Sequence, residues 1–394
     1  MNFSLYIHIP FCVSKCLYCD FYSVPKTCVL DSYIESVVSE LNFRINEYKI
    51  DGVINKIQSV YIGGGTPSLL SFSQIKKLND FFLLKNLLTN DAEVTIEVNP
   101  DDVNEQFIDF LNESFINRIS CGLQSMNDDV LRFVKRRGSV SDNIHALELL
   151  KSKWKKNFSV DLICGLPGED EKSFFYGLNK ILEYKPNHIS MYSLTIEDST
   201  PLGKLYNSGK LDYNFDFADD LWLKAKSFLT ENGYLQYEVS NFANDNFESK
   251  HNLAYWNHQS YIGIGSGATG TVYNSDGSGI RWTNSLDIQK YINFWLNKFD
   301  NINVKNIEEL ENIDIDTSKI EFFIMGLRKI SGITTKEYED LFKEKIDTKI
   351  INCFEKWHKK NLCEIVKDKQ SGSIRYSLGQ KGILFLNAFL EEII

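Results

Sequence analysis

The chain has 394 residues, of which 43% are hydrophobic and 13% are aromatic, a composition that excludes a disordered protein. It carries 43 Lys and Arg residues against 53 Asp and Glu residues, which gives a net charge of −10. An acidic chain of this kind is not typical of nucleic-acid-binding proteins, which have basic surfaces. It contains no apolar run of about 18 residues, and its start, MNFSLYIHIPFC, has no signal-peptide pattern. We therefore expect a cytoplasmic protein without a transmembrane segment.

Six short β-branched runs alternate with helical patterns over the first 200 residues. Strands are predicted at residues 5–10, 59–63, 93–99, 118–123, 159–166 and 188–196. Helices are predicted at residues 31–45, 71–88, 103–113, 128–136, 141–150 and 173–184. Such alternation favours a parallel sheet with right-handed crossovers. Six units predict an α/β fold built on a partial (β/α)6 barrel.

The regular alternation fades after residue 200. A helix is predicted at residues 218–232, and the polar, acidic stretch 301–316 indicates a boundary. Residues 320–394 have the pattern of a small, mainly helical domain with a short hairpin near residues 362–378. The predicted division is a core barrel at 1–235, an extension at 236–300 and a mainly helical C-terminal domain at 301–394.

A C-x3-C-x2-C triplet, made of Cys12, Cys16 and Cys19, follows the first predicted strand. Tight spacing in a loop lets three thiolates converge on one [4Fe–4S] cluster. Three protein ligands for four irons leave one iron open, as in catalytic metal sites generally. On spacing alone, the alternative is a zinc ion held by the three cysteines and His8.

Further candidate residues fall at later strands, at the rim where barrels of this kind carry their chemistry. The glycine-rich run 63–67 lets a ligand approach the backbone closely. Glu97 ends the third predicted strand, where a carboxylate can bind hydroxyl groups. The later positions are Gln124, Arg136 and Asp161. Taken singly, the glycines also fit a tight turn, and the polar residues also fit structural or solvated roles.

Several motifs together resemble the oxygen-independent coproporphyrinogen III oxidase family of radical-SAM proteins. They are the run from Tyr6 to Phe21, YIGGGTPS (61–68), EVNP (97–100), SCGLQS (120–125) and DLICGLPGE (161–169). The resemblance spans residues 5 to 270 and continues through EFFIMGLRKISG (321–332). It implies a cluster rather than zinc, with S-adenosylmethionine on the open iron and radical formation when that cofactor is reductively split. It also implies cofactor contacts from Tyr6, Tyr18, Gly64, Gly65, Thr66, Glu97, Gln124, Arg136 and Asp161.

The family has two branches, which the residues after the triplet distinguish. The oxidases have a fourth cysteine in a C-x-C ending and an N-terminal extension that helps bind substrate. Here Asp20 and Phe21 follow Cys19, and the triplet begins at residue 12. The second branch consists of haem chaperones and has a C-D-F ending with an H-N-x-x-Y-W motif. This chain has that motif at residues 251–256.

The motif also has a physical interpretation. His251 can supply an imidazole to haem iron, while Tyr255 and Trp256 can pack against the porphyrin. An aromatic core segment with a hydrogen-bonded histidine is the alternative, and His258 is a second candidate ligand. The resemblance implies a chaperone that delivers haem to an acceptor protein, expected to be a haem-using membrane enzyme, with a reducing electron donor for the cluster. The alternative is an oxidase that converts two propionates to vinyls, so whether the chain is an enzyme stays open.

Overall fold

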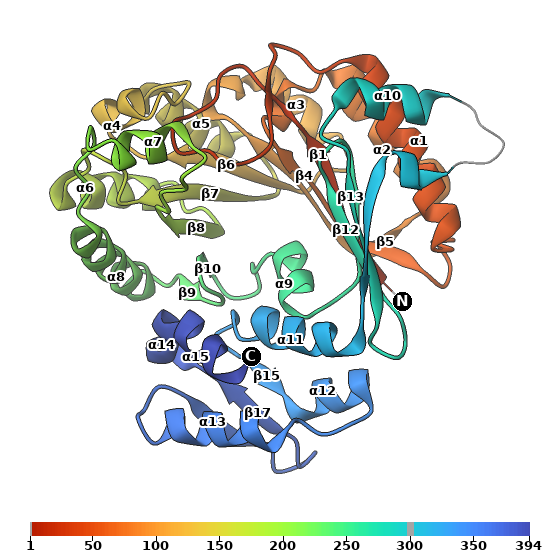
Figure 1. Cartoon of the computed structure of the whole chain (residues 1–394). Coiled ribbons are helices and arrows are strands. Elements are labelled where there is room, and N and C mark those ends of the chain that lie inside the picture. The colour runs from red at the N-terminus through yellow and green to blue at the C-terminus, as the bar shows by residue number, and fades with distance from the viewer. Residues whose placement is uncertain (1, 298–302) are drawn as a thin grey trace.

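The computed structural model describes residues 2–297 and 303–394 (Figure 1). Its core is six parallel strands that neighbour one another in chain order, as the sequence predicts. They are β1 (Asn2–Ile9), β4 (Lys56–Gly64), β5 (Leu88–Val98), β6 (Arg118–Gln124), β7 (Asn157–Cys164) and β8 (His188–Ser193). The expected α/β fold with a partial barrel is confirmed.

Helices cover the outer face of this sheet (Figure 1). They are α1 (Asp31–Glu47), α2 (Phe72–Lys85), α3 (Glu105–Asn112), α5 (Val140–Ser152), α6 (Glu171–Leu182) and α8 (Phe215–Glu231). Helices α4 (Asp128–Phe133) and α7 (Pro201–Asn207) instead lie beside the loop after β1, where Leu17 packs against a cluster that includes Val130 and Leu202. Local signals define several helix ends; for example, Ser71 and Gln74 form a capping box at α2. In the described ranges no helix is long and apolar enough to cross a membrane.

The strands place polar side chains inside the barrel because successive residues point to opposite faces. In β1, Leu5 and Ile7 are fully buried in the large hydrophobic core that also includes residues of the surrounding helices. The alternate residues Ser4, Tyr6 and His8 face the other way and form hydrogen bonds with polar groups. The barrel interior is therefore lined with groups that can bind a polar ligand.

The sheet extends beyond the six core strands to twelve, an arrangement that the sequence analysis did not predict. On one side it continues through β11 (Tyr261–Ile264), β12 (Thr269–Tyr273), β13 (Gly279–Asn284) and β14 (Glu308–Ile313). On the other side it continues through β10 (Asn241–Ala243) and β9 (Leu235–Gln236). Two helices belong to this region, α9 (Lys250–Trp256) and α10 (Ile288–Leu296). The added strands are only two to six residues long, so their sequence periodicity is weak.

The predicted boundary between residues 300 and 301 lies outside the described residues. Beyond it, β14 still pairs with β13 in the large sheet. The following segment has a separate hydrophobic core, formed by residues from 322 to 389. The division into three domains stays a prediction.

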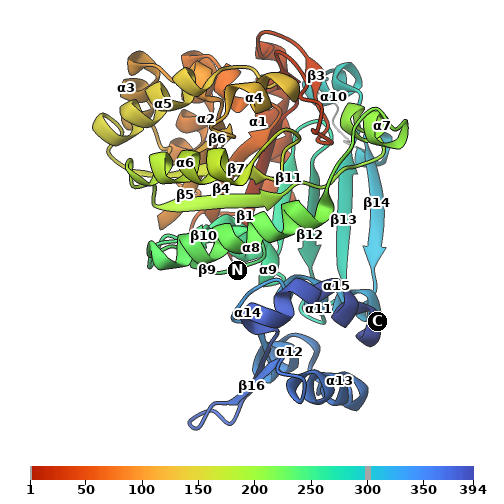
Figure 2. The same cartoon turned by 90° about the vertical axis from the view of Figure 1, so that its left-hand side faces the viewer.

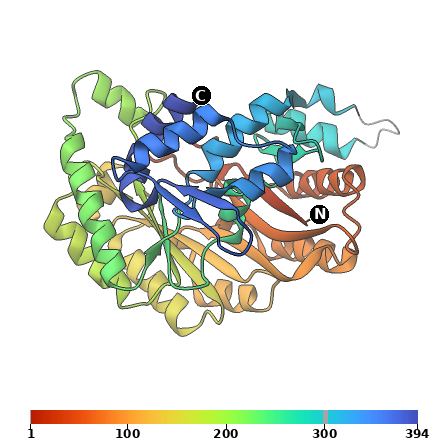
Figure 3. The same cartoon turned by 90° about the horizontal axis from the view of Figure 1, so that it is seen from below.

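The C-terminal segment combines helices with a small three-stranded sheet. Its elements are α11 (Ile315–Gly326), β15 (Ile333–Thr334), α12 (Thr335–Phe342), α13 (Thr348–His358), β16 (Glu364–Lys367), β17 (Ile374–Ser377), α14 (Gly379–Gly382) and α15 (Leu386–Ile393). Strands β16 and β17 form the predicted hairpin. This segment lies below the barrel, at the end opposite the loop after β1 and next to α9 (Figures 1, 2 and 3).

Short elements complete the chain. Strands β2 (Phe11–Cys12) and β3 (Val24–Pro25) pair within the loop after β1. Single 3-10 turns occur at Pro67–Leu69, Pro100–Asp102, Val304–Asn306 and Ile383–Phe385. The β2–β3 pair holds the ends of the cysteine loop together at the upper end of the barrel.

Candidate functional site

A cavity of about 380 Å³ lies at the carboxyl ends of the core strands. The three cysteines and eight of the nine residues predicted to contact S-adenosylmethionine line it. These eight are Tyr18, Gly64, Gly65, Thr66, Glu97, Gln124, Arg136 and Asp161. The ninth, Tyr6, lies deeper, where its hydroxyl is 2.8 Å from His8 Nδ1. Residues from five strand ends thus meet because parallel strands end at the same edge of the sheet.

The cysteine loop contacts two polar side chains from other parts of the barrel. Thr66 Oγ1 donates to Cys12 Sγ at 3.3 Å, and Arg136 Nη1 lies 4.0 Å from Cys16 Sγ. Burial raises the pKa of the Cys19 thiol, with a smaller lowering from a backbone hydrogen bond. A guanidinium beside a thiol favours its thiolate, which is the form that binds iron. The loop therefore has the donor set and a cation suited to a cluster of thiolate ligands.

His8 does not complete a zinc site with these cysteines. One of its ring nitrogens is 2.8 Å from the Tyr6 hydroxyl, and the other is 3.1 Å from the carbonyl oxygen of Tyr22. The side-chain arrangement does not support the zinc alternative.

The glycine run brings the backbone of β4 against the cysteine loop. Gly64 has φ +117°, and a Cβ there would lie 2.5 Å from the His8 ring. At Gly65 a Cβ would lie 2.7 Å from the carbonyl oxygen of Phe11. Only glycine permits this conformation and this approach. The space beside the cysteines therefore depends on the absence of side chains at both positions.

Glu97 lines the cavity, and both of its carboxylate oxygens accept hydrogen bonds. Oε1 accepts a 2.8 Å hydrogen bond from the Tyr61 hydroxyl, and Oε2 accepts a 3.0 Å bond from Gly64 N. Burial raises the pKa of Glu97 to about 7, although both hydrogen bonds act in the opposite direction. The carboxyl therefore changes charge near neutral pH, at a position where it can accept hydrogen bonds from ligand hydroxyls.

The remaining predicted residues are held by contacts between strands. Arg136 Nη2 donates to Asn99 Oδ1 at 2.6 Å and to the carbonyl oxygen of Gly122 at 2.7 Å. Gln124 adopts φ +66° at the end of β6. Asp161 accepts hydrogen bonds from Ser120 Oγ at 3.1 and 2.9 Å, and burial raises its pKa. Together they provide a cation, an amide and a carboxyl around one cavity.

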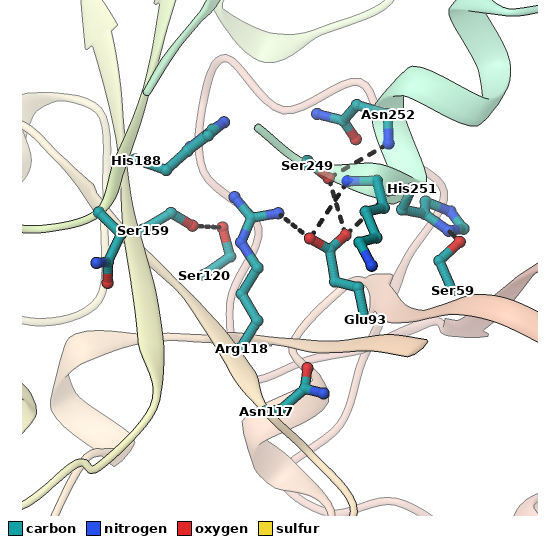
Figure 4. Close-up of polar contacts among 12 residues, drawn as sticks. Ser59, Glu93, Asn117, Arg118, Ser120, Ser159, His188, Ser249, His251 and Asn252 are labelled. Atoms are coloured by element: carbon teal, nitrogen blue, oxygen red, sulfur yellow. Dashed lines mark hydrogen bonds and ion pairs between the residues drawn. The ribbon is translucent and has the colours of Figure 1, made fainter. Parts of the chain in front are cut away.

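The H-N-x-x-Y-W motif forms helix α9 at the opposite end of the barrel. The carboxylate of Glu93 accepts hydrogen bonds from Ser249 Oγ at 3.2 Å, Lys250 N at 3.3 Å and His251 N at 3.1 Å (Figure 4). Arg118 Nη1 lies 3.6 Å from the same carboxylate. A negative charge at a helix N-terminus is favourable because the backbone N–H groups there lack partners within the helix. Glu93 thereby fixes the position of the motif.

His251 is buried beside the half-buried Tyr255, away from the cysteine cavity. His251 Nδ1 is 3.0 Å from Ser59 Oγ, and its Nε2 is 3.0 Å from the Tyr255 hydroxyl. Burial lowers the pKa of His251 to about 3, so its ring is neutral. The Tyr61 ring stacks on His251 at a centroid distance of 5.1 Å. Tyr61 therefore lies between the motif and Glu97.

Trp256, the last motif residue, faces a different environment. It lines a second cavity between α9 and the C-terminal segment. The Arg328 guanidinium lies 4.8 Å from the Trp256 ring centroid. Among the described residues, nothing hydrogen-bonds to its indole nitrogen. The structure thus brings His251 and Tyr255 together and directs Trp256 to another surface.

The sequence of this chain is similar to those of several known proteins. A model of the Radical SAM superfamily matches residues 6–175. Curated proteins named heme chaperone HemW match nearly end to end. The one from Lactococcus lactis is 35% identical, covering 99% of this chain and 97% of that protein. Those from Buchnera aphidicola (subspecies Schizaphis graminum) and Escherichia coli are 34% and 30% identical, each covering 98% of this chain and 97% of the relative. The chain belongs to the HemW family.

This HemW-family fold is shared with a solved oxidase. The structure of coproporphyrinogen III oxidase (HemN) from Escherichia coli matches with a TM-score of 0.77 and 19% identity, covering 99% of this chain and 89% of that chain. At this identity the likeness shows the fold alone. The radical-SAM barrel predicted from the motifs is therefore confirmed.

Two aromatic residues of this HemW-family cavity were missed by the sequence analysis. Tyr61 and Tyr192 line the cavity from β4 and β8. Each tyrosine lies two residues after a serine on the same face of its strand, Tyr61 after Ser59 and Tyr192 after Ser190, and this face points to the barrel interior. This alternation could be predicted from the sequence. The hydrogen bond from Tyr61 to Glu97 could not, because it joins residues 36 positions apart.

Proposed function

We propose that this HemW-family protein is a haem chaperone, which binds haem and transfers it to an acceptor protein. The proposal includes a [4Fe–4S] cluster on Cys12, Cys16 and Cys19, with S-adenosylmethionine beside it. Its main support is full-length similarity to curated haem chaperones, together with the H-N-x-x-Y-W helix in this chain. The acceptor, the electron donor and the cytoplasmic location expected from the sequence belong to the same proposal.

The residues of the upper cavity fit both cofactors. The three thiols would hold three irons and leave the fourth for the cofactor's amino and carboxylate groups. The backbone of Gly64 and Gly65 lies where it can face the methionyl amino group, and Glu97 can accept from ribose hydroxyls. When bound, the cluster and S-adenosylmethionine supply one-electron chemistry.

Binding of S-adenosylmethionine is expected to depend on pH through Glu97. Because burial places the pKa of this carboxyl at about 7, the fraction that is ionised rises as the pH increases through neutrality. If hydroxyl binding needs the carboxylate, affinity should rise up to about tenfold between roughly pH 6 and pH 8. Calorimetric titration of the anaerobically reconstituted protein measures this. Glu97→Gln should bind more weakly and lose the pH dependence; a retained dependence would assign it to another group.

Haem binding at the motif involves His251, Tyr255 and Trp256 in this proposal. Both ring nitrogens of His251 are engaged, with Ser59 and Tyr255. Iron ligation by His251 therefore requires that one of these hydrogen bonds be exchanged for the metal. Since Tyr255 lies on the same short helix as His251, movement of α9 away from Ser59 is the simplest way to free Nδ1.

The proposed function is tested by haem titration of the reconstituted full-length protein, followed by visible absorption. Wild type is expected to bind haem stoichiometrically, and His251→Ala to bind at least about tenfold more weakly. His145→Gln, at an exposed histidine on α5, is the control and should bind haem as the wild type does. Coproporphyrinogen III with S-adenosylmethionine and a reductant is assayed in parallel. Haem binding without turnover supports the chaperone, whereas efficient decarboxylation would favour the oxidase alternative.

A further inference from the structure

Tyr61 on β4 contacts both proposed binding sites. Its side chain is half-buried and lines the upper cavity. Its hydroxyl donates to Glu97 Oε1 at 2.8 Å, and its ring stacks on the imidazole of His251 with a centroid distance of 5.1 Å and an interplanar angle of 26°. One side chain therefore connects a residue proposed to bind S-adenosylmethionine with the residue proposed to ligate haem iron.

The hydroxyl of Tyr61 binds Glu97 more strongly when the carboxyl group is ionised. Burial raises the pKa of Tyr61, so the phenol keeps its proton and acts as the donor. A hydrogen bond to a charged carboxylate is about twice as strong as one between neutral groups. Glu97 Oε2 accepts from Gly64 N, and each carboxylate oxygen can accept a further hydrogen bond. Ribose hydroxyls can therefore bind Glu97 without displacing Tyr61, and by keeping Glu97 ionised they strengthen its bond to Tyr61.

The charge of Glu97 changes near neutral pH, because burial raises its pKa to about 7. Several strands and one loop bring charged or titratable groups to face it. These groups are Tyr61, Asp161, Arg136, Tyr6 and Tyr192. At about pH 6 the carboxyl is mostly protonated, so a ligand that needs the carboxylate must ionise it on binding, whereas at about pH 8 it is already ionised. The effect of such a ligand on Tyr61 is therefore larger on the acidic side of neutrality.

The ring of Tyr61 helps to hold His251 in its present position. Ser59, two residues earlier on the same face of β4, lies 3.0 Å from His251 Nδ1 (Figure 4). The ring of Tyr6, on the neighbouring strand β1, stacks on Tyr61 at a centroid distance of 6.3 Å. Iron ligation requires the His251 ring to leave either Ser59 or Tyr255. A firmly held Tyr61 ring therefore opposes the movement that frees His251.

We propose that Tyr61 is a positioning residue that couples the two sites, so that S-adenosylmethionine in the upper cavity weakens haem binding at the α9 motif. The proposal rests on the haem-binding function proposed above and adds its regulation. The cofactor's hydroxyls hold Glu97 as the carboxylate, the carboxylate holds the Tyr61 hydroxyl, and the Tyr61 ring holds His251. Linkage requires the reverse effect as well, so haem must weaken the binding of S-adenosylmethionine by the same factor. The ligand of the upper cavity thus sets how readily haem is given up.

Tyr61→Phe isolates this coupling, because it keeps the aromatic ring and removes only the hydrogen bond to Glu97. The contacts that Ser59 and Gly64 make from the same strand stay in place, so transmission through the backbone of β4 would survive the substitution. Tyr176→Phe is the matched control, since Tyr176 is 73% exposed on α6 and lies outside both sites.

Haem is titrated into the reconstituted full-length protein with and without saturating S-adenosylmethionine, and the cluster is kept oxidised so that the cofactor is not cleaved. At about pH 6, the cofactor should weaken haem binding about fivefold in wild type and in Tyr176→Phe. At about pH 8 this effect should fall below about twofold, and in Tyr61→Phe it should stay below about twofold at either pH. A wild-type haem affinity that does not respond to the cofactor, or an equal response in Tyr61→Phe, would overturn the coupling and leave the haem-binding function in place.

A second measurement needs no haem. Histidine rings are isotope-labelled for NMR, and the His251 signal is identified by its loss in His251→Ala. At about pH 6, S-adenosylmethionine should shift this signal in wild type but not in Tyr61→Phe, because the hydroxyl connects the ring to Glu97. Glu97→Gln, whose side chain cannot ionise, should lose the shift as well and replaces Tyr61→Phe if circular dichroism shows the latter to be unfolded. A shift of equal size in wild type and variant would overturn the proposal. If wild type binds no haem, the proposed function fails, and this comparison still decides whether Tyr61 connects Glu97 to His251.

Discussion

Replacing Cys12, Cys16 and Cys19 together by alanine should abolish cluster formation. These are the three thiols that line the upper cavity. After anaerobic reconstitution, wild type should hold roughly four irons per chain, and the triple variant close to none. Iron and sulfide analysis with visible absorption measures this. S-adenosylmethionine affinity should fall with the cluster, because the proposed site anchors this cofactor on the open iron.

The matched control for this prediction is Cys28→Ala. Cys28 is exposed and lies outside the residues that line the cavity, so its replacement should leave iron content unchanged. Circular dichroism should show that the triple variant keeps the secondary structure of the barrel, since the cysteines lie outside the core strands, in the segment after β1 that contains only the short β2–β3 pair. A triple variant that incorporates wild-type iron and sulfide would place the cluster elsewhere in the chain.

Replacing Arg44 by methionine should lower the free energy of unfolding by about 3–5 kcal/mol, because the change leaves buried carboxylates without their cation. The Arg44 guanidinium forms ion pairs with Glu308 and, at 2.9 Å, with Glu47, and it lies 3.6 Å from Glu40. It also lies 4.2 Å from the centroid of the Trp282 ring. These contacts join α1 to β13 and β14 at the edge of the large sheet. Urea unfolding followed by tryptophan fluorescence measures the loss.

The effect of Arg44→Met should grow with pH. Burial raises the pKa of Glu308 to about 8 even with Arg44 present, and it also raises the pKa of Glu40. A carboxyl whose pKa is higher in the folded than in the unfolded chain contributes stability at low pH, and this contribution is lost as the pH rises through the folded value. Without Arg44 the pKa of Glu308 should rise further. The destabilisation should therefore be smaller near pH 6 than near pH 9.

An exposed arginine provides the comparison for Arg44. Arg132 pairs with Asp129 at 2.6 Å, but its side chain is 73% exposed. Arg132→Met should therefore change stability by no more than about 1 kcal/mol at either pH. Equal effects of the two substitutions would mean that the buried network is not a stabilising connection between α1 and the sheet edge.

The two ends of the barrel are connected by a short series of contacts. Tyr61 donates to Glu97 at the upper cavity, and its ring stacks on His251 of the motif. Ser59, two residues earlier in the same strand, contacts His251 Nδ1. Thus β4 alone carries groups that touch both the proposed S-adenosylmethionine site and α9.

Much of the upper site was predictable from the sequence alone. Six apolar runs alternating with helical patterns predict parallel strands, and the carboxyl ends of such strands lie at one edge. Residues as distant as Cys12 and Asp161 therefore had to meet, and both line one cavity. The cysteine motif and the glycine run each consist of residues that are close together in the sequence. For that reason they could be interpreted without knowledge of their neighbours.

The lower sites depended on tertiary structure. The sequence showed His251 and His258 as two candidate imidazoles seven residues apart, with no means of ranking their nitrogens. Ser59, which is 192 residues from His251, contacts one nitrogen of that ring, whereas the carbonyl oxygen of Ser318 contacts Nε2 of His258. These contacts join residues far apart in the chain, so no local sequence pattern encodes them. The sequence by itself therefore determined the barrel and its cysteine rim, and only the packing of α9 against the barrel and the C-terminal segment decided which groups each histidine ring contacts.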